Sequence, residues 1–316
     1  MAGSTTRRYT TLLVGLQLLL ATIVIAGSLS HVFSLRRAAL DQHLEAAVGQ
    51  ARIVEDQLTQ TLNLANLTLQ GLAEAVTLPP EPASNAQLEQ FQRRLLFLRS
   101  ISAAEPGGRI VASSNPENIG QLISTAGWTP PSPDPAANFL RLGPLWAGRD
   151  FADGRAIRND EPIPGDALNF VPLARGEAHL GNQWLFVATL NPDYFLNHFS
   201  RHIDPALATV EIIDWEGRLL ISSREGDLVG RPYVTGADLS RLHDEEIGSI
   251  PEEIEHGRTV MTAFRASRSY PLFVMVHVDR EAALRQWAAD TRQTLTMIGL
   301  GLLTLLVLSS VVIIRL

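Results

Sequence analysis

Residues 108–120 read Gly-Arg-Ile-Val-Ala-Ser-Ser-Asn-Pro-Glu-Asn-Ile-Gly, and residues 217–230 repeat the pattern as Gly-Arg-Leu-Leu-Ile-Ser-Ser-Arg-Glu-Gly-Asp-Leu-Val-Gly. A further apolar run precedes each copy, at residues 101–104 and 210–213. Because glycine readily adopts the positive φ of tight hairpin turns, each copy predicts two strands joined at the first glycine. The recurrence after roughly 109 residues predicts two copies of one small module.

The composition excludes several functional classes. The 316 residues are 46% apolar and 19% charged, with a net charge of −7, which is typical of a globular protein with added apolar segments and not of a disordered or nucleic-acid-binding chain. The chain has no cysteine, which excludes disulfides, thiolate metal sites and thiol nucleophiles. It has no lysine either, which excludes Schiff-base chemistry and a P-loop lysine.

Two uncharged apolar runs predict two transmembrane helices. The first covers residues 11–33, about 23 residues, with paired arginines at 7–8 and 36–37. This run is longer than the apolar region of a signal peptide and lacks a clear cleavage site, so we interpret it as an uncleaved anchor. The second run covers residues 295–314. Two spans place both termini on one side of the membrane, and we expect that side to be the cytoplasm.

A long amphipathic helix is predicted after the first span. Its apolar residues recur at steps of three and four, which is a near-heptad stripe with one extra residue. Such a stripe must be buried, either against a second copy in a dimer stalk or against the domain of the same chain. Both arrangements can hold at different heights along the helix. The stripe consists of Leu40, Leu44, Ala47, Ala51, Val54, Leu58, Leu62, Ala65, Leu69, Leu72 and Val76.

The rest of the soluble sequence alternates short strands and helices. Prolines at 79, 80 and 82 end the long helix, and Ser84 with Gln87 forms a capping box for the next one. Asn191-Pro192-Asp193 is a helix start. A polar helix is expected at 237–246 and another from Asp279 into the second span. Strands are expected at 139–142, 168–173, 184–190, 259–266 and 272–278.

This order of elements resembles the double Cache (dCache, PDC-type) sensor region of bacterial transmembrane receptors. The resemblance is carried by residues 107–114 with 119–120, by their counterparts 214–223 with 229–230, by 191–195, and by 264–267 with 270–272. It implies an α+β fold, with a long N-terminal stalk helix and two PAS-like antiparallel-sheet modules flanked by two transmembrane helices. The implied divisions are a cytoplasmic N-terminus at 1–10, transmembrane helix 1 at 11–34, the stalk at 35–78, a membrane-distal Cache module at 79–203, a membrane-proximal Cache module at 204–280, a juxtamembrane helix at 281–293, transmembrane helix 2 at 294–314 and a cytoplasmic end at 315–316.

The resemblance also implies a function. Such a region relays binding of a small extracytoplasmic molecule, an organic acid or an amino acid, to a cytoplasmic output domain such as a diguanylate cyclase, a phosphodiesterase or a histidine kinase. No output domain is present in this chain. We expect a two-pass protein of the bacterial inner membrane, a homodimer through the stalk helix, and no nucleic-acid partner. The alternative is a membrane-anchored accessory protein that binds a protein partner and has no small ligand.

No catalytic set emerges from the sequence, so we do not expect an enzyme. The histidines lack the i, i+4 spacing of zinc hydrolases, and no Gly-x-Ser-x-Gly elbow or P-loop occurs. The eight histidines are scattered, and surface or capping roles are expected for them. We predict no metal site and no cofactor.

A ligand site is expected in the distal module, between the sheet and the loops that cover it, as the resemblance implies. Four residues of the stretch 143–175 suit a carboxylate ligand, because an arginine can donate two hydrogen bonds to a carboxylate and an aromatic ring can wall a pocket. Ser113 and Ser114 are expected to make turn and strand-end hydrogen bonds instead. The four candidate ligand contacts are Trp146, Arg149, Asn169 and Arg175.

Overall fold

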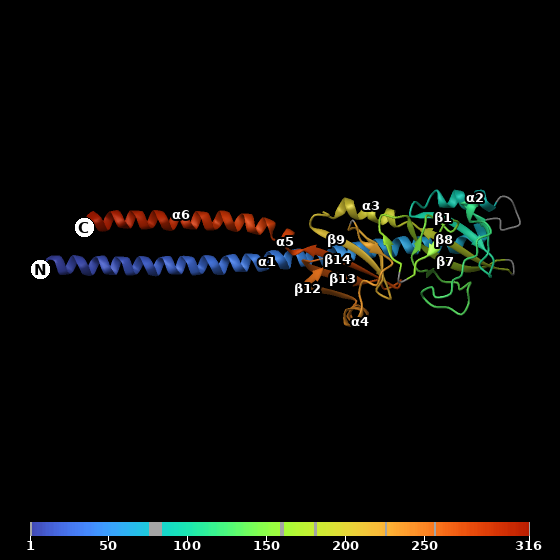
Figure 1. Cartoon of the computed structure of the whole chain (residues 1–316), viewed down its shortest axis with the longest axis horizontal. Helices are drawn as coiled ribbons and strands as arrows, with labels where there is room; N and C mark the ends of the chain where they lie inside the picture. Colours follow the sequence, from blue (N-terminus) through green and yellow to red (C-terminus); the bar gives the residue numbers. More distant parts are fainter. Residues whose placement is uncertain are drawn as a thin grey trace.

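A computed structural model describes residues 2–75, 84–158, 161–179, 182–224, 226–255 and 257–315. Two antiparallel sheets follow one another along a single long helix, α1 (Ala2–Ala75) (Figure 1). The helix packs against strands of both sheets. The predicted helix end at residues 78–82 lies outside the described residues.

The first sheet belongs to the module farther from the chain ends, here called the distal module (Figure 1). Its strand order is β2-β1-β8-β7-β4-β5, with β3 beside β7, and α2 covers β1 and β2. The predicted strands at 168–173 and 184–190 are confirmed, but only the last two residues of the predicted strand 139–142 pair with β7. The elements are α2 (Ser84–Gln92), β1 (Leu98–Ala104), β2 (Ile110–Ser113), η1 (Pro116–Asn118), β3 (Arg141–Leu142), β4 (Trp146–Ala147), β5 (Arg155–Ala156), β7 (Asn169–His179), β8 (Asn182–Leu190) and α3 (Pro192–His202).

The second sheet belongs to the module nearer the chain ends, here called the proximal module, and has the order β10-β9-β14-β13-β12 (Figure 1). A two-stranded pair of β6 with β11 joins the two modules, since β6 comes from the distal loop and β11 from the proximal hairpin. The elements are β6 (Ile163–Pro164), β9 (Ala208–Asp214), β10 (Leu219–Ser222), β11 (Leu228–Val229), α4 (Gly236–Asp244), β12 (Ile247–Glu255), β13 (Arg258–Ala266), β14 (Leu272–Asp279), α5 (Arg280–Ala283) and α6 (Arg285–Arg315).

The sequence repeat is a repeat of backbone structure. Gly108 and Gly217 have φ of +84° and +78°. A Cβ added at Gly108 would lie 2.0 Å from the backbone oxygen of Ile123, and one added at Gly217 would lie 2.1 Å from that of Val234. The serine after the second strand of each hairpin accepts the same hydrogen bond from the backbone of the first strand. Ile101 N donates to Ser114 Oγ at 3.0 Å, and Val210 N donates to Ser223 Oγ at 2.8 Å. The prediction of two related hairpins with structural serines is therefore confirmed.

The apolar stripe of α1 packs against the protein's own sheets. Its residues from Ala47 to Leu72 are buried in the core that both modules share. The interpretation that this stripe forms the dimer contact is wrong for these residues, because β7, β13 and β14 cover it. The heptad spacing reports burial but does not identify the partner surface. On α1, Ile53, Leu64 and Leu67 remain exposed.

Buried polar contacts tie α1 to both modules. The Glu55 carboxylate pairs with the Arg265 guanidinium at 3.3 Å in the proximal module, and Tyr270 donates its hydroxyl hydrogen to Asn63 at 2.8 Å. In the distal module, Arg175 Nη1 donates to Asn66 Oδ1 at 2.6 Å. The helix is thus bonded to the last strands of the proximal module and to the distal sheet.

Two helical segments are long and apolar enough to cross a membrane, Val14–Ala75 within α1 and Trp287–Val311 within α6. They run side by side, and both chain ends lie at the same end of the molecule (Figure 1). The Trp287 indole N–H donates to the backbone oxygen of Val32 at 3.3 Å. The continuous helix expected from Asp279 is interrupted, because α5 ends at Ala283, with Leu284 as its C-cap, before α6 begins at Arg285.

Candidate ligand-binding site

Strand alternation gives the distal sheet two different faces. On β1, Ile101 and Ala103 point toward the core that contains α1, whereas Ala104 belongs to a separate apolar cluster. This second cluster includes Trp128 and Phe151 from the covering loop. The face away from α1, here called the outer face, is therefore the one that the loop covers.

A buried carboxylate lies at the centre of the outer face. Asp150 is only 5% exposed, and its Oδ1 accepts hydrogen bonds from Ser100 Oγ at 2.7 Å and from Asn118 Nδ2 at 2.8 Å. The backbone N–H of Phe151 donates to the same oxygen, and Asn115 Nδ2 donates to the other at 2.9 Å.

Aromatic rings line the same space. Trp146, Phe151 and Phe170 contact one another, with ring centroids 5.4 to 5.7 Å apart. The Trp146 side chain is half-buried, yet its Nε1 is buried and has no hydrogen-bond acceptor among the described residues. A buried N–H without an acceptor carries a desolvation cost, so an additional acceptor at this position would be favourable.

The four predicted ligand contacts do not converge. Trp146 lies on the outer face, and Arg149 is exposed in the covering loop next to Asp150. Asn169 is buried on the strand beside Trp146, and its Nδ2 donates to the backbone oxygen of Ala167 at 2.8 Å.

Arg175 lies on the other face of the sheet. Its guanidinium bonds to Asn66 of α1 and, at 2.6 Å, to the Glu177 carboxylate. This position suits a role in holding α1 to the sheet. Contact with a ligand stays a prediction for all four residues.

Sequence reasoning missed Asp150, Asn115 and Asn118. Asn115 and Asn118 lie in the polar loop of the first hairpin, for which we predicted no ligand contact. Asp150 follows Arg149 directly, and the arginine was preferred as the charged ligand contact. A buried carboxylate can be recognised in a sequence only when the donors around it are also known, and these come from segments up to 50 residues away.

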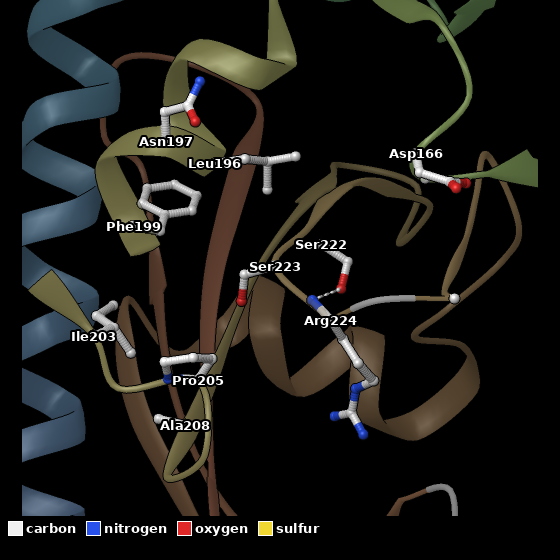
Figure 2. A pocket seen from close by; sticks show the side chains of 12 residues that line it. Asp166, Leu196, Asn197, Phe199, Ile203, Pro205, Ala208, Ser222, Ser223 and Arg224 are labelled. Carbon is white, nitrogen blue, oxygen red and sulfur yellow. Dashed lines mark hydrogen bonds between the residues drawn. The ribbon is translucent and has the colours of Figure 1, made fainter. Parts of the chain in front are cut away.

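A second opening lies where the two modules meet (Figure 2). It is a cavity of about 470 Å³ between α3, the distal loop at Asp166 and the proximal hairpin at Ser222 to Arg224. The polar groups on its wall are already engaged in part: Ser222 Oγ accepts from the Arg224 backbone N–H, and the Arg224 guanidinium pairs with Glu255 at 2.9 Å. The volume is sufficient for a small organic molecule.

No protein-family model and no curated protein matches the sequence. Among solved structures, the fold is similar to the extracellular domain of the proposed histidine kinase rpHK1S-Z16, with a TM-score of 0.60 and 18% identity over 79% of this chain and 100% of that one. It is also similar to the ligand-binding domain of the Pseudomonas aeruginosa PAO1 amino acid chemoreceptor PctB in complex with L-Arg, with a TM-score of 0.52 and 14% identity over 79% and 92% of the two chains. At these identities the likeness is one of fold. Outside its two long apolar segments, the chain therefore has the fold of these extracellular and ligand-binding domains, which agrees with the fold expected from the resemblance to Cache-type sensor regions.

Proposed function

We propose that this chain is a two-pass membrane sensor that binds a small extracytoplasmic molecule and relays the event to a cytoplasmic output domain. The proposal is supported by the sensor fold, by two helical segments that are apolar enough to cross a membrane, and by the common position of the two chain ends. The histidine kinase and chemoreceptor domains that share the fold are sensor domains, not catalytic ones.

The ligand site that the geometry supports best is the outer face of the distal module. The observation that carries it is the buried Trp146 N–H without an acceptor, beside two aromatic walls and the Asp150 carboxylate. A carboxylate oxygen of an organic acid or amino acid would accept from this N–H, and the exposed Arg149 can close over it from the covering loop.

Arg175 would hold the sheet to α1, because its guanidinium already bonds to Asn66 and Glu177. Asn169 remains a candidate contact, since its buried Oδ1 has no hydrogen-bond donor among the described residues.

The signal would pass along bonded elements. A ligand that prefers an ordered covering loop shifts the distal module between two arrangements, and Arg175 connects that module to α1 through Asn66. In the proximal module, β14 continues into α5 and α6, so its displacement reaches the second membrane helix directly. We propose a homodimer that uses the exposed residues Ile53, Leu64 and Leu67 of α1.

The test is thermal unfolding of the full chain in detergent with a panel of L-amino acids and small dicarboxylic acids. The variant Trp146→Phe removes the N–H and keeps an aromatic wall. A hydrogen bond to a charged group contributes about 1.5–3 kcal/mol, so we expect Kd to rise roughly 10- to 100-fold. Trp215→Phe is the matched control, since Trp215 lies in the proximal module, stacked on Phe273.

Equal ligand stabilisation of Trp146→Phe and the wild type would refute this site. A wild type that no member of the panel stabilises would instead favour the accessory-protein alternative. In that case Ile53, Leu64 and Leu67 become the candidate surface for a protein partner.

A further inference from the structure

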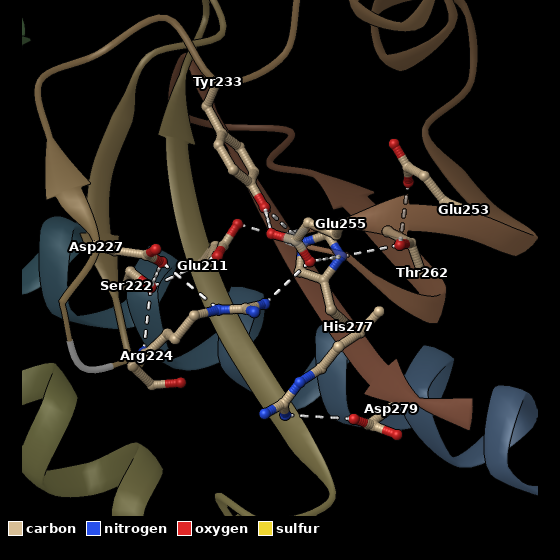
Figure 3. A network of polar contacts seen from close by, with 12 residues as sticks. Glu211, Ser222, Arg224, Asp227, Tyr233, Glu253, Glu255, Thr262, His277 and Asp279 are labelled. Atoms are coloured by element: carbon tan, nitrogen blue, oxygen red, sulfur yellow. Dashed lines mark hydrogen bonds and ion pairs between the residues drawn. The ribbon is translucent and has the colours of Figure 1, made fainter. Parts of the chain in front are cut away.

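The proximal module carries a second buried polar cluster, which the proposed sensing function does not use (Figure 3). Glu211 of β9 is fully buried and His277 of β14 is 3% exposed. Glu255, at the end of β12, completes a group in which one donor atom from each residue lies within 4.8 Å of the others. Tyr233 and Thr262 surround the group.

This cluster occupies the same place in its module as the Asp150 network in the distal one. In the distal hairpin Ser102 Oγ lies 2.8 Å from Ser113 Oγ, and in the proximal hairpin Glu211 Oε1 accepts from Ser222 Oγ at 3.5 Å. His277 of β14 lies opposite Thr209 of β9, just as Thr189 of β8 lies opposite Ser100 of β1 in the distal sheet.

The cluster lies on the face away from α1. Thr262 and Arg265 are three residues apart on a regular strand, so they point to opposite faces. Arg265 bonds to Glu55 of α1. Thr262 and its neighbour His277 therefore face the side that corresponds to the outer face of the distal module.

The contact with Thr262 bears on which ring nitrogen of His277 can bind a metal. Thr262 Oγ1 donates to Glu253 Oε2 at 3.4 Å and lies 2.8 Å from His277 Nδ1. When the hydroxyl hydrogen of Thr262 is directed to Glu253, Thr262 accepts from Nδ1–H, and Nε2 is then the nitrogen available to bind a metal. A histidine fixed in this way through its second nitrogen is the usual arrangement around a bound metal.

Nε2 of His277 faces a buried carboxylate oxygen of Glu211. Glu211 Oε2 lies 3.2 Å from Nε2, which is an ion pair when His277 is protonated, and it accepts no further hydrogen bond from the described residues. Tyr233 does not supply one, because its hydroxyl donates to Glu255 Oε1 and lies 3.5 Å from Nε2. A proton on Nε2 bridges the two atoms in the metal-free protein, and a metal ion in its place would bind both of them.

We propose that Glu211, Glu255 and His277 bind a divalent transition metal, with Zn²⁺ as the best match. Zn²⁺ bonds of about 2.0–2.2 Å in a tetrahedron place neighbouring ligand atoms roughly 3.3–3.5 Å apart, close to the Glu211–His277 separation of 3.2 Å. A mixed imidazole and carboxylate set suits Zn²⁺. Arg224, at 2.9 Å from Glu255 Oε2, orients that carboxylate.

The metal would join three strands of the proximal sheet at one point. Of these, β14 leads into α5, whose first turn is capped by Asp279 Oδ1 accepting from Ala282 N at 2.9 Å. Metal binding would therefore stiffen the strand that leads to the second membrane helix. This inference does not depend on the distal ligand site.

The test uses the full chain in detergent, without a histidine tag, after removal of metals with EDTA. Co²⁺ replaces Zn²⁺ in such sites and gives a visible absorption band when its geometry is tetrahedral. We expect one Co²⁺ per chain, displaced by Zn²⁺. His277→Gln and Glu211→Gln should each weaken binding by at least roughly 10-fold, and Thr262→Val by about 10-fold, because groups that orient a ligand affect metal affinity by 10–100-fold.

The matched control is His243→Gln, which changes an exposed histidine of the same module that bonds to the backbone oxygen of Trp215. Absence of a cobalt band together with absence of zinc retention in the wild type would overturn the proposal. Equal affinity in the wild type and in Glu211→Gln would also overturn it. If His277→Gln does not fold, Glu211→Gln, which keeps the side-chain shape, decides the result.

Discussion

Replacing the two turn glycines tests the repeated hairpin most sharply. In Gly108→Ala the new Cβ would lie 2.0 Å from the backbone oxygen of Ile123, at a φ of +84°. The positive φ costs about 1–2 kcal/mol for a residue with a Cβ, and the clash adds roughly 1–3 kcal/mol because a backbone segment must move. Gly120→Ala is the matched control, since its φ is +92° but nothing lies within 4 Å of the added Cβ.

We therefore expect Gly108→Ala to destabilise the distal module by roughly 2–5 kcal/mol and Gly120→Ala by about 1–2 kcal/mol. The proximal hairpin offers the same pair in Gly217→Ala and Gly226→Ala. Hydrogen exchange read by mass spectrometry reports each module separately, because it assigns the lost protection to peptides. Equal loss of protection in the two members of a pair would refute the reasoning from the close carbonyl contact.

Two further changes test packing and pH dependence. Tyr270→Phe removes the hydroxyl that donates to Asn63, and we expect a loss of about 1 kcal/mol in the free energy of unfolding, measured by denaturant titration. Burial raises the pKa of Asp214 from 3.8 to about 6, so its contribution to stability is present below pH 4 and is lost as the pH rises through 6. We then expect the free energy of unfolding of Asp214→Asn to exceed that of the wild type by up to about 3 kcal/mol at pH 7 and to equal it at pH 3.5. Equal melting curves of the two proteins at both pH values would contradict this.

Local chemistry made the hairpins and their serines predictable. A glycine that must adopt positive φ and a serine that bonds to the preceding strand each act within a few residues, so the pattern is visible in the chain. The length of α1 was predictable for the same reason, because periodicity is a local property. The surface that covers its stripe was not, since a buried face looks the same whether it packs on a sheet or on a second helix.

The sites depend on groups brought together by the fold. Arg175 was selected as a charged residue of the predicted pocket, but strand register directs it to α1 and not to the outer face. Glu211, Glu255 and His277 come from three strands, and no spacing in the chain joins them. Their relation becomes visible only when β9, β12 and β14 are aligned, which requires the sheet order.

The central claim is that ligand binding in the distal module moves α6 relative to α1. Because the chain has no cysteine, spin labels can be attached at Ser34→Cys in α1 and Ala289→Cys in α6, two exposed positions on these neighbouring helices. Pulsed electron paramagnetic resonance would measure the distance between them, with labelled chains diluted in unlabelled ones. At a saturating concentration of a ligand identified by thermal shift, we predict a displacement of about 1–2 Å that is absent in Trp146→Phe. An unchanged distance distribution in the wild type would contradict the account.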